Sequence, residues 1–246
     1  MKVQFEKKVV SGAVLIAIVF MFNLPVQAMH ISEGFLPPAW ALAWGLICLP
    51  FLTAGFFTIQ RNITADPKNL VLLALSGAFV FVMSALKIPS VTGSCSHPTG
   101  VGLGAVLFGP LAMSIISLIV LLFQALLLAH GGLTTLGANL FSMGIIGPIV
   151  AYLVYRLTRL MGTTPGLAIF IAAFLGDILT YVTTAVQLGM AHPDQGNIGL
   201  SIVKFLGLFA LTQIPLAIVE GLVSVVVFNV ITSHDDRLLR ERQVIS

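Results

Sequence analysis

Charged residues are scarce in this sequence. Only 9% of its 246 residues are Asp, Glu, Lys or Arg, whereas 58% are hydrophobic, and the mean hydropathy is +1.06. A soluble domain typically carries about 25% charged residues, which keep its surface hydrated. The apolar residues also run in long blocks that lack the polar face of a soluble helix. The composition therefore excludes a water-soluble domain and predicts an all-α integral membrane protein.

The motifs of several enzyme classes are absent as well. The sequence contains no G-x-x-x-x-G-K-[ST] loop for nucleotide phosphates and no H-E-x-x-H helix for catalytic zinc. It also offers no convincing Ser/His/Asp or Cys/His catalytic set. We therefore expect neither an enzyme nor a resident cofactor, and any ATP hydrolysis must belong to another chain.

Cysteine is nearly absent: the two residues, Cys48 and Cys95, lack the paired spacing of a metal site. Cys48 lies in an apolar run, where packing is the expected role and a disulfide with Cys95 is the alternative. The formal net charge is only +3, and the basic residues stand at the ends of apolar segments. Membrane topology accounts for that placement, so we expect no nucleic-acid partner.

The N-terminal segment has the three parts of a secretory signal peptide. Lys2, Lys7 and Lys8 form a basic region, residues 9–24 are apolar, and the sequence VQA at 26–28 offers small residues for cleavage. The prediction is a signal peptide at 1–28 that is removed after Ala28. An uncleaved first transmembrane helix is the alternative.

Cleavage after Ala28 would give His30 an unusual chemical setting. The mature chain would begin at Met29 on the outer side of the membrane, with His30 as its second residue. The Met29 amine, the His30 backbone nitrogen and the His30 imidazole can then wrap one ion in fused chelate rings. Such tetragonal nitrogen sites suit nickel(II), copper(II) and cobalt(II), and binding should release protons.

Apolar runs of about 20 residues predict the membrane-spanning helices. With Met29 outside, Arg61 and Lys68 fall inside, as the excess of positive charge in cytoplasmic loops requires. The loop that contains His97 then falls outside, on the same side as Met29. The candidate spans are 38–58, 70–87, 101–129, 137–160, 166–189 and 199–231.

The run 101–129 is too long for one crossing and too short for two at 1.5 Å per residue. Gly109 and Pro110 supply a break in its middle. A broken or re-entrant element there makes the region cross an even number of times, which leaves Arg156 and Arg159 inside. We therefore predict about seven transmembrane helices in the mature chain, with the N-terminus outside and the C-terminus cytoplasmic.

A polar, glycine-rich loop around His97 stands out among these apolar runs. Gly100, Gly102 and Gly104 follow His97 and allow backbones to approach closely. They favour either helix packing or a close-fitting loop beneath a bound ion, and the sequence leaves both open. A His97 imidazole on the same side as His30 would complete a plane of four nitrogens.

Other polar residues allow two readings. Asp177 and Glu220 are acids inside apolar spans, with Lys204 as the main cation nearby; structural pairing or a partner contact is favoured over a proton relay. His130 and His192 are read as loop or capping residues, with a transient metal contact as the alternative.

Three sequence motifs resemble those of the CbiM family, the substrate-capturing membrane subunits of energy-coupling-factor cobalt transporters. They are MHISEGFLP at residues 29–37, GSCSHPTG at 93–100 and LAHGGLTTLGAN at 128–139. The resemblance runs through nearly all of the mature chain. It implies the S-component bundle of six helices with one extra N-terminal helix, in a multi-pass protein of the cell inner membrane.

The resemblance also implies a ligand set and partners. The metal ligands would be Met29, His30 and His97, with Glu33, Ser96 and His130 as supporting residues. Partners would be a transmembrane coupling subunit, cytoplasmic ATPase subunits and a small auxiliary membrane subunit, besides membrane lipid. The cargo would be cobalt(II) for cobalamin biosynthesis, with nickel(II) as the alternative.

The expected organisation is a signal peptide at 1–28, a transmembrane metal-binding domain at 29–232 and a charged cytoplasmic tail at 233–246. Three rival functions remain at this point. They are a proton-coupled secondary transporter using Asp177 or Glu220, an intramembrane zinc hydrolase using His97 and His130, and a purely structural membrane subunit.

Overall fold

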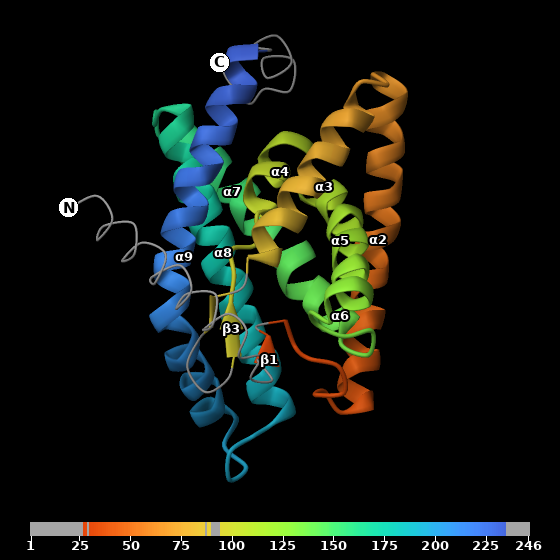
Figure 1. Ribbon diagram of the computed structural model, residues 1–246, viewed down its shortest axis with the longest axis vertical. Coiled ribbons are helices and arrows are strands. Elements are labelled where there is room, and N and C mark those ends of the chain that lie inside the picture. Colours follow the sequence, from red (N-terminus) through yellow and green to blue (C-terminus); the bar gives the residue numbers. More distant parts are fainter. Residues whose placement is uncertain (1–26, 29, 87, 90–93, 235–246) are drawn as a thin grey trace, which may run out of the picture.

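The computed structural model describes residues 27–28, 30–86, 88–89 and 94–234. These residues form a helical bundle with a very small sheet on its inside (Figure 1). The helices are α2 (Pro38–Ala65), α3 (Asn69–Ala85), α4 (Val101–Phe108), α5 (Pro110–Leu128), α6 (Leu136–Asn139), the π-helical η2 (Leu140–Ile146), α7 (Gly147–Leu160), α8 (Pro165–Ala191) and α9 (Ile198–His234). Most of the predicted signal peptide, residue Met29 and the end of the predicted tail lie outside the described residues.

The helices confirm the predicted all-α membrane fold. Within the described residues, five helices are long and apolar enough to cross a membrane, and α3 is a shorter apolar helix. One of the five is the continuous run Leu136–Leu160, which joins α6, η2 and α7. Together with α3 and the short α4, the five spans make seven helical segments in the described part of the chain, close to the number expected.

The break predicted in the run 101–129 is present at Gly109. This residue ends α4 and precedes α5 with a φ of 84°, a conformation that glycine adopts without strain. Pro110 then occupies the first turn of α5, where its missing N–H costs nothing. With only eight residues, α4 is too short to cross a membrane, so the region adds one short helix and one crossing helix.

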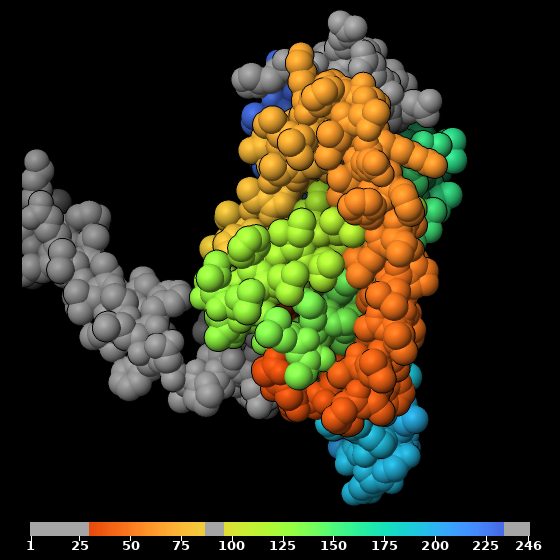
Figure 2. Space-filling view, turned by 90° about the vertical axis from the view of Figure 1, so that its right-hand side faces the viewer, coloured from red at the N-terminus to blue at the C-terminus, as the bar shows by residue number. Residues whose placement is uncertain are grey.

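Helix α2 is the outermost helix of the bundle. Only 11% of its most apolar 18-residue window is buried, against 33–50% in the other four spans. Figure 2 shows α2 running along the outside of the molecule beside α5, and ending above the α8–α9 turn. This peripheral first helix corresponds to the extra N-terminal helix that the sequence led us to expect.

The glycines after His97 serve helix packing. A Cβ on Gly102 would lie 2.7 Å from the Ala173 backbone, and a Cβ on Gly104 would lie 2.5 Å from the Met113 sulfur. These contacts hold α4 against α8 and α5, and every residue of α4 is buried. Of the two readings left open, packing applies to Gly102 and Gly104.

The small sheet was not predicted from the sequence. Its strands are β1 (Gln27–Ala28), β2 (Ile88–Pro89) and β3 (Ser94–Ser96), in the order β1-β3-β2. Strand β1 pairs parallel with β3, and β2 pairs antiparallel with it. Because β1 leads into His30 and β3 leads into His97, the sheet brings these two distant parts of the chain together.

The ends of the bundle differ in the segments they carry. The α2–α3 turn, the α7–α8 turn and the end of α9 lie at one end, which is uppermost in Figure 1. Strand β1, α6 and the α8–α9 turn lie toward the other end.

Cys48 is a buried free thiol of α2 that donates to the Gly137 carbonyl (3.2 Å), so it packs as predicted.

Candidate metal centre

Three imidazole rings from separate segments meet inside the bundle. They belong to His30, His97 and His130, with exposed fractions of 5%, 1% and 0%. Their ring centroids are 4.6 Å apart for His30–His97, 4.4 Å for His30–His130 and 4.8 Å for His97–His130. One nitrogen of each ring lies within 4.8 Å of the others, which makes this a possible metal-ion site.

The His30 and His97 rings direct nitrogens at each other. His30 Nδ1 lies 3.0 Å from His97 Nε2. Imidazole nitrogens bind a divalent transition-metal ion at about 2.0–2.1 Å, so two ligands at right angles lie about 2.9 Å apart. The observed spacing therefore suits two neighbouring ligands of one ion.

The other nitrogen of His97 fixes the tautomer of that ring. Nδ1 lies 2.9 Å from the Pro98 carbonyl, which can only accept a hydrogen bond. Nδ1 therefore carries the proton, and Nε2 keeps its lone pair free to accept from His30 or to bind a metal.

A side-chain clamp holds the backbone next to His30. The Ile31 N–H donates to Asn139 Oδ1 (2.8 Å), and Asn139 Nδ2 donates to the Ile31 carbonyl (3.0 Å). Thr135 Oγ1 donates to the same carbonyl at 2.5 Å. Each buried hydrogen bond contributes about 1 kcal/mol net. Thr135 directly precedes α6 and Asn139 is the last residue of this helix, so α6 sets the position of the His30 segment.

Glu33 supports the same segment through hydrogen bonds with Thr134. The Thr134 N–H donates to Glu33 Oε2 (3.2 Å), and the Gly34 N–H donates to Thr134 Oγ1 (2.9 Å). Hydrogen bonding from the Thr134 side chain, and less from the Thr134 and Leu133 backbone, lowers the pKa of Glu33. The ionised form is therefore favoured at neutral pH. Its stabilising contribution is lost as the pH falls through that lowered pKa.

The two glycines after His130 make room for the N-terminal segment. A Cβ on Gly132 would lie 2.4 Å from Glu33 Cα and 2.7 Å from the Glu33 backbone nitrogen. Backbone atoms cannot yield as a flexible side chain can, so any larger residue must displace residues 30–34.

We expect Gly132→Ala to lower the cobalt(II) affinity of the processed protein about 10- to 100-fold, the cost typical of disturbing the support of metal ligands. Titration calorimetry measures it. Gly207→Ala is the matched control, because a Cβ at Gly207 meets nothing within 4 Å. Equal affinities for the two variants would show that the close approach at Gly132 does not matter for binding.

Helices α8 and α9 hold the loop that carries His97. Tyr181 Oη of α8 donates to the His97 carbonyl (2.6 Å), as does Gln213 Nε2 of α9 (3.3 Å). Glu220 accepts from the Thr99 backbone N–H (2.5 Å) and from the Thr99 hydroxyl (3.0 Å). His97 is thus fixed from a different part of the bundle than His30.

The remaining predicted supporting residue, Ser96, faces α9 and not the imidazoles. Its Oγ lies 2.6 Å from Thr212 Oγ1, and its side chain is fully buried. Ser96 therefore supports the site only through the position of the His97 loop.

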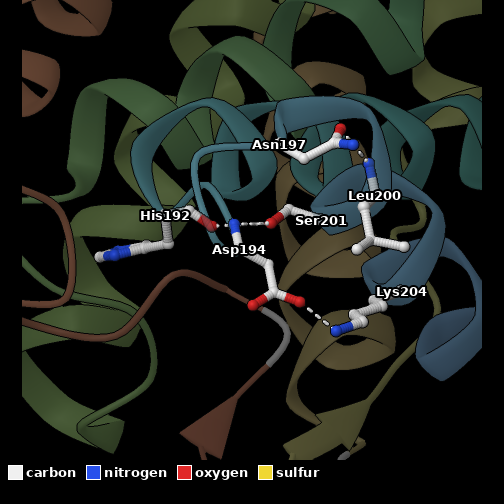
Figure 3. A network of polar contacts seen from close by, with 6 residues as sticks. All are labelled: His192, Asp194, Asn197, Leu200, Ser201 and Lys204. Atoms are coloured by element: carbon white, nitrogen blue, oxygen red, sulfur yellow. Dashed lines mark hydrogen bonds and ion pairs between the residues drawn. The ribbon is translucent and has the colours of Figure 1, made fainter.

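The intramembrane acids are not paired with Lys204, contrary to one reading of the sequence. Lys204 pairs with Asp194 in the α8–α9 turn, and its side chain is 58% exposed (Figure 3). Asp177 accepts instead from Gln213 Nε2 (2.5 Å), and Glu220 accepts from Thr99. Both acids are fully buried and connect to the His97 loop, so Glu220 acts as a structural partner of that loop.

His192 lies outside the imidazole cluster. It ends α8, and its Nε2 lies 3.0 Å from the Phe35 carbonyl, so it connects the N-terminal loop to the α8–α9 turn. Figure 3 shows its ring pointing away from the hydrogen bonds that Ser201 makes with the His192 carbonyl and the Asp194 N–H. This agrees with the reading of His192 as a capping residue.

The cavity beside His30 and His97 is very small, with a volume of about 10 Å³. That volume corresponds to about one water-sized sphere. Asn139, Thr180 and Tyr181 contribute to its polar lining. The cavity can accept a single ion or water molecule but no organic ligand.

The structure thus brings together His30, His97 and His130, while Met29 lies outside the described residues. Sequence reasoning assigned His130 only a supporting role and did not identify Asn139, Thr135 or Tyr181 as contacts of the site. The motif LAHGGLTTLGAN contains Thr135 and Asn139, so it was a signal for these two contacts but not for Tyr181.

Fold and site together define a class: a multi-pass helical membrane protein with a buried, nitrogen-rich cluster beside an ion-sized cavity. Two solved structures described as a transition metal transporter share the fold, each with a TM-score of 0.74. The first, a truncated form, is 29% identical and covers 83% of this chain and 99% of its own. The second is 28% identical and covers 85% and 94%.

The chain belongs to the CbiM family. The family, described as "Cobalt uptake substrate-specific transmembrane region", matches residues 30–238. A cobalt transport protein CbiM of Ruminiclostridium cellulolyticum is 54% identical over 97% of both chains. Another from Chlorobium limicola is 57% identical over 90% of this chain and 87% of its own. Since these relatives are transport proteins, the expectation that the chain is a transporter component and not an enzyme is confirmed.

Proposed function

We propose that this chain is the substrate-capturing subunit of an ATP-driven energy-coupling-factor importer for cobalt(II), which supplies cobalamin biosynthesis. The observation that carries the proposal is the 3.0 Å separation of His30 Nδ1 and His97 Nε2 beside a cavity of one-ion size. The names of the relatives support cobalt as the cargo. Nickel(II) remains the alternative, because a four-nitrogen site suits both ions.

The proposed ligands are the Met29 amine, the His30 backbone nitrogen, and the His30 and His97 imidazoles. This set requires removal of the signal peptide after Ala28, since only then does Met29 carry a free amine. The Asn139 and Thr135 clamp supports it, because it fixes the Ile31 backbone directly after the chelating residue. The amine and the amide must both lose protons, so affinity should fall as the solution becomes more acidic.

The distribution of basic residues supports an orientation with the site facing outward. Arg61, Lys68, Arg156 and Arg159 belong to segments at the end of the bundle opposite to the α8–α9 turn. Lysine and arginine concentrate on the cytoplasmic side of membrane proteins. That end would therefore face the cytoplasm, together with the C-terminus and the ATPase partners.

The proposed partner subunits are those that the resemblance to the CbiM family implies, and the lack of a phosphate-binding loop in this sequence agrees with them. A coupling subunit in the membrane, cytoplasmic ATPase subunits and a small auxiliary membrane subunit would convert ATP hydrolysis into cobalt release. The rival function is a secondary transporter that relays protons through Asp177 or Glu220. The hydrogen bonds that connect both acids to the His97 loop favour a positioning role over a relay.

Uptake of radioactive cobalt into cells that express the chain with its partner subunits separates the two functions. We expect uptake to stop when the ATPase subunit carries an inactive phosphate loop. It should continue when a protonophore collapses the proton gradient while cellular ATP is maintained. Uptake by this chain alone that vanishes with the gradient would establish the secondary transporter instead.

A further inference from the structure

We propose that a groove between α2, α3 and α5 binds one anionic phospholipid, with an acyl chain in the groove and the headgroup at the α2–α3 turn. The groove has a volume of about 610 Å³, and every residue that lines it is apolar. Figure 2 shows the three helices together on one face of the molecule. None of the lining residues belongs to the imidazole cluster, so the proposal does not rest on the proposed metal site.

Small residues on α3 and buried residues on α5 give the groove its depth. Ala74, Gly77 and Ala78 line it from α3. A Cβ added to Gly77 would meet only the Ile116 side chain, at 3.3 Å. Ile116 and Val120 of α5 are buried and form the floor of the groove, whereas Ala74 and Ala78 are exposed. The groove therefore offers apolar depth for a slender, flexible chain.

The length of the groove matches one leaflet of a bilayer. It extends along α3 from Leu70 to Val82, which is about 18 Å at 1.5 Å per residue. The hydrocarbon core of a bilayer is about 30 Å thick, so one leaflet accounts for about 15 Å. Leu70 and Val82 are 55% and 58% exposed, so the groove opens sideways into the membrane. An acyl chain of one leaflet fits this length, whereas a crossing helix of a partner would need contacts over the full thickness.

The groove begins at a basic turn. Ile59 and Leu70 line its first part, and each stands two residues from a cation, Arg61 or Lys68. Both cations are exposed, and among the described residues no acid forms an ion pair with either. Asp66 lies between them in the sequence and accepts from the Lys68 backbone N–H (2.9 Å). Two cations above an apolar groove match the anionic headgroup and the acyl chain of one phospholipid.

A lipid bound here would join the outermost helix to the rest of the bundle. Only 11% of the most apolar window of α2 is buried, and α2 contributes Phe56 and Ile59 to the groove. An acyl chain that contacts α2, α3 and α5 together therefore adds apolar burial to the folded state, and its binding should raise the melting temperature. The α2–α3 turn belongs to the end that the proposed orientation places at the cytoplasm, where the leaflet carries anionic lipids.

Lipid titration of the purified full chain in detergent, followed by native mass spectrometry, tests the proposal. The probes are phosphatidylglycerol and, as the zwitterionic reference, phosphatidylcholine with the same acyl chains. The wild type is expected to retain one phosphatidylglycerol and to bind it at least about tenfold more tightly than phosphatidylcholine. It should also melt at a higher temperature with phosphatidylglycerol. Equal binding of the two lipids would overturn the proposal.

Variants of the basic turn test the headgroup contact. Arg61→Gln and Lys68→Gln should each lower the affinity for phosphatidylglycerol about fivefold and leave that for phosphatidylcholine unchanged. Arg156→Gln is the matched control, because Arg156 is an exposed cation at the same end of the bundle but on α7. If the turn variants bind phosphatidylglycerol as tightly as this control, the turn does not hold the headgroup and the proposal fails.

A variant that fills the groove tests the position of the acyl chain. Ala78→Phe places a ring in the groove and should lower the affinity for phosphatidylglycerol at least about tenfold, the effect of losing about two buried CH₂ groups. Val71→Phe is the matched control, because Val71 is an exposed residue of α3 that does not line the groove. If Ala78→Phe binds the lipid like this control but no longer copurifies with the membrane coupling subunit, the groove holds a partner helix and the proposal is wrong.

Discussion

Replacement of His97 by alanine should lower the cobalt(II) affinity of the processed protein by at least about 100-fold. Its Nε2 is one of two imidazole nitrogens that meet at ligand spacing, and its Nδ1 is fixed by the Pro98 carbonyl. Loss of a partner that only orients a ligand already costs about 10- to 100-fold, so loss of the ligand itself must cost more. Titration calorimetry in detergent measures the change.

The control for this variant is His192→Ala. His192 contacts the N-terminal loop through the Phe35 carbonyl but lies outside the imidazole cluster. Its loss should change the affinity no more than about fivefold, since one exposed hydrogen bond contributes about 1 kcal/mol. If both variants bind cobalt like the wild type, the His30–His97 pair is not the binding site.

Insertion of one proline between Met29 and His30 should have an effect of similar size, because proline has no amide proton to lose and cannot itself supply a backbone ligand. The inserted residue would displace the free amine by about 3.3–3.6 Å, the length of one residue. The amine could then no longer close a five-membered ring with the His30 backbone nitrogen. We expect at least about a 100-fold loss of affinity. The chain holds the amine next to the other ligands, so the amine binds the ion with little further loss of entropy, and that advantage disappears.

The matched control is Met29→Ala, which changes the first side chain but keeps the amine in place. It should bind cobalt within about threefold of wild type, after mass spectrometry confirms cleavage before residue 29. An inserted variant that binds as tightly as this control would remove the amine from the ligand set.

Local signals in the sequence were sufficient for most of the helices. Apolar runs indicated the spans, and the Gly109–Pro110 pair marked the break between α4 and α5; proline also stands in the first turn of α2 and α8. Glycine and proline act through the backbone dihedrals of their own residues. For that reason these signals can be recognised without knowledge of the tertiary fold.

The site could be predicted only in part. His30 and His97 were identified because topology places them on one side of the membrane. The stacking of His130 on His30 was not, because the two are far apart in the chain and meet only through the turn at Gly131 and Gly132. The pairing of Lys204 with Asp194 was missed for a similar reason: hydropathy placed Lys204 inside a span, whereas the exposed start of α9 leaves its charge at the surface.

The position of the two imidazoles depends on separate helices. Asn139 of α6 holds the backbone after His30, whereas Tyr181 of α8 and Glu220 of α9 hold the loop around His97. Such long-range contacts are a property of the packed bundle, and periodicity in the sequence does not reveal them. They explain how a cluster of buried imidazoles remains ordered without covalent links between its segments.

The central claim is that the processed chain captures one cobalt ion through its free N-terminus and the two imidazoles. The most direct test is the metal content of purified wild-type protein and of the proline-inserted variant, measured side by side by inductively coupled plasma mass spectrometry. Both should be loaded with cobalt at neutral pH and desalted. The account predicts about one cobalt per chain in the wild type and nearly none in the variant. No cobalt in the wild type, with cleavage after Ala28 confirmed, would contradict it.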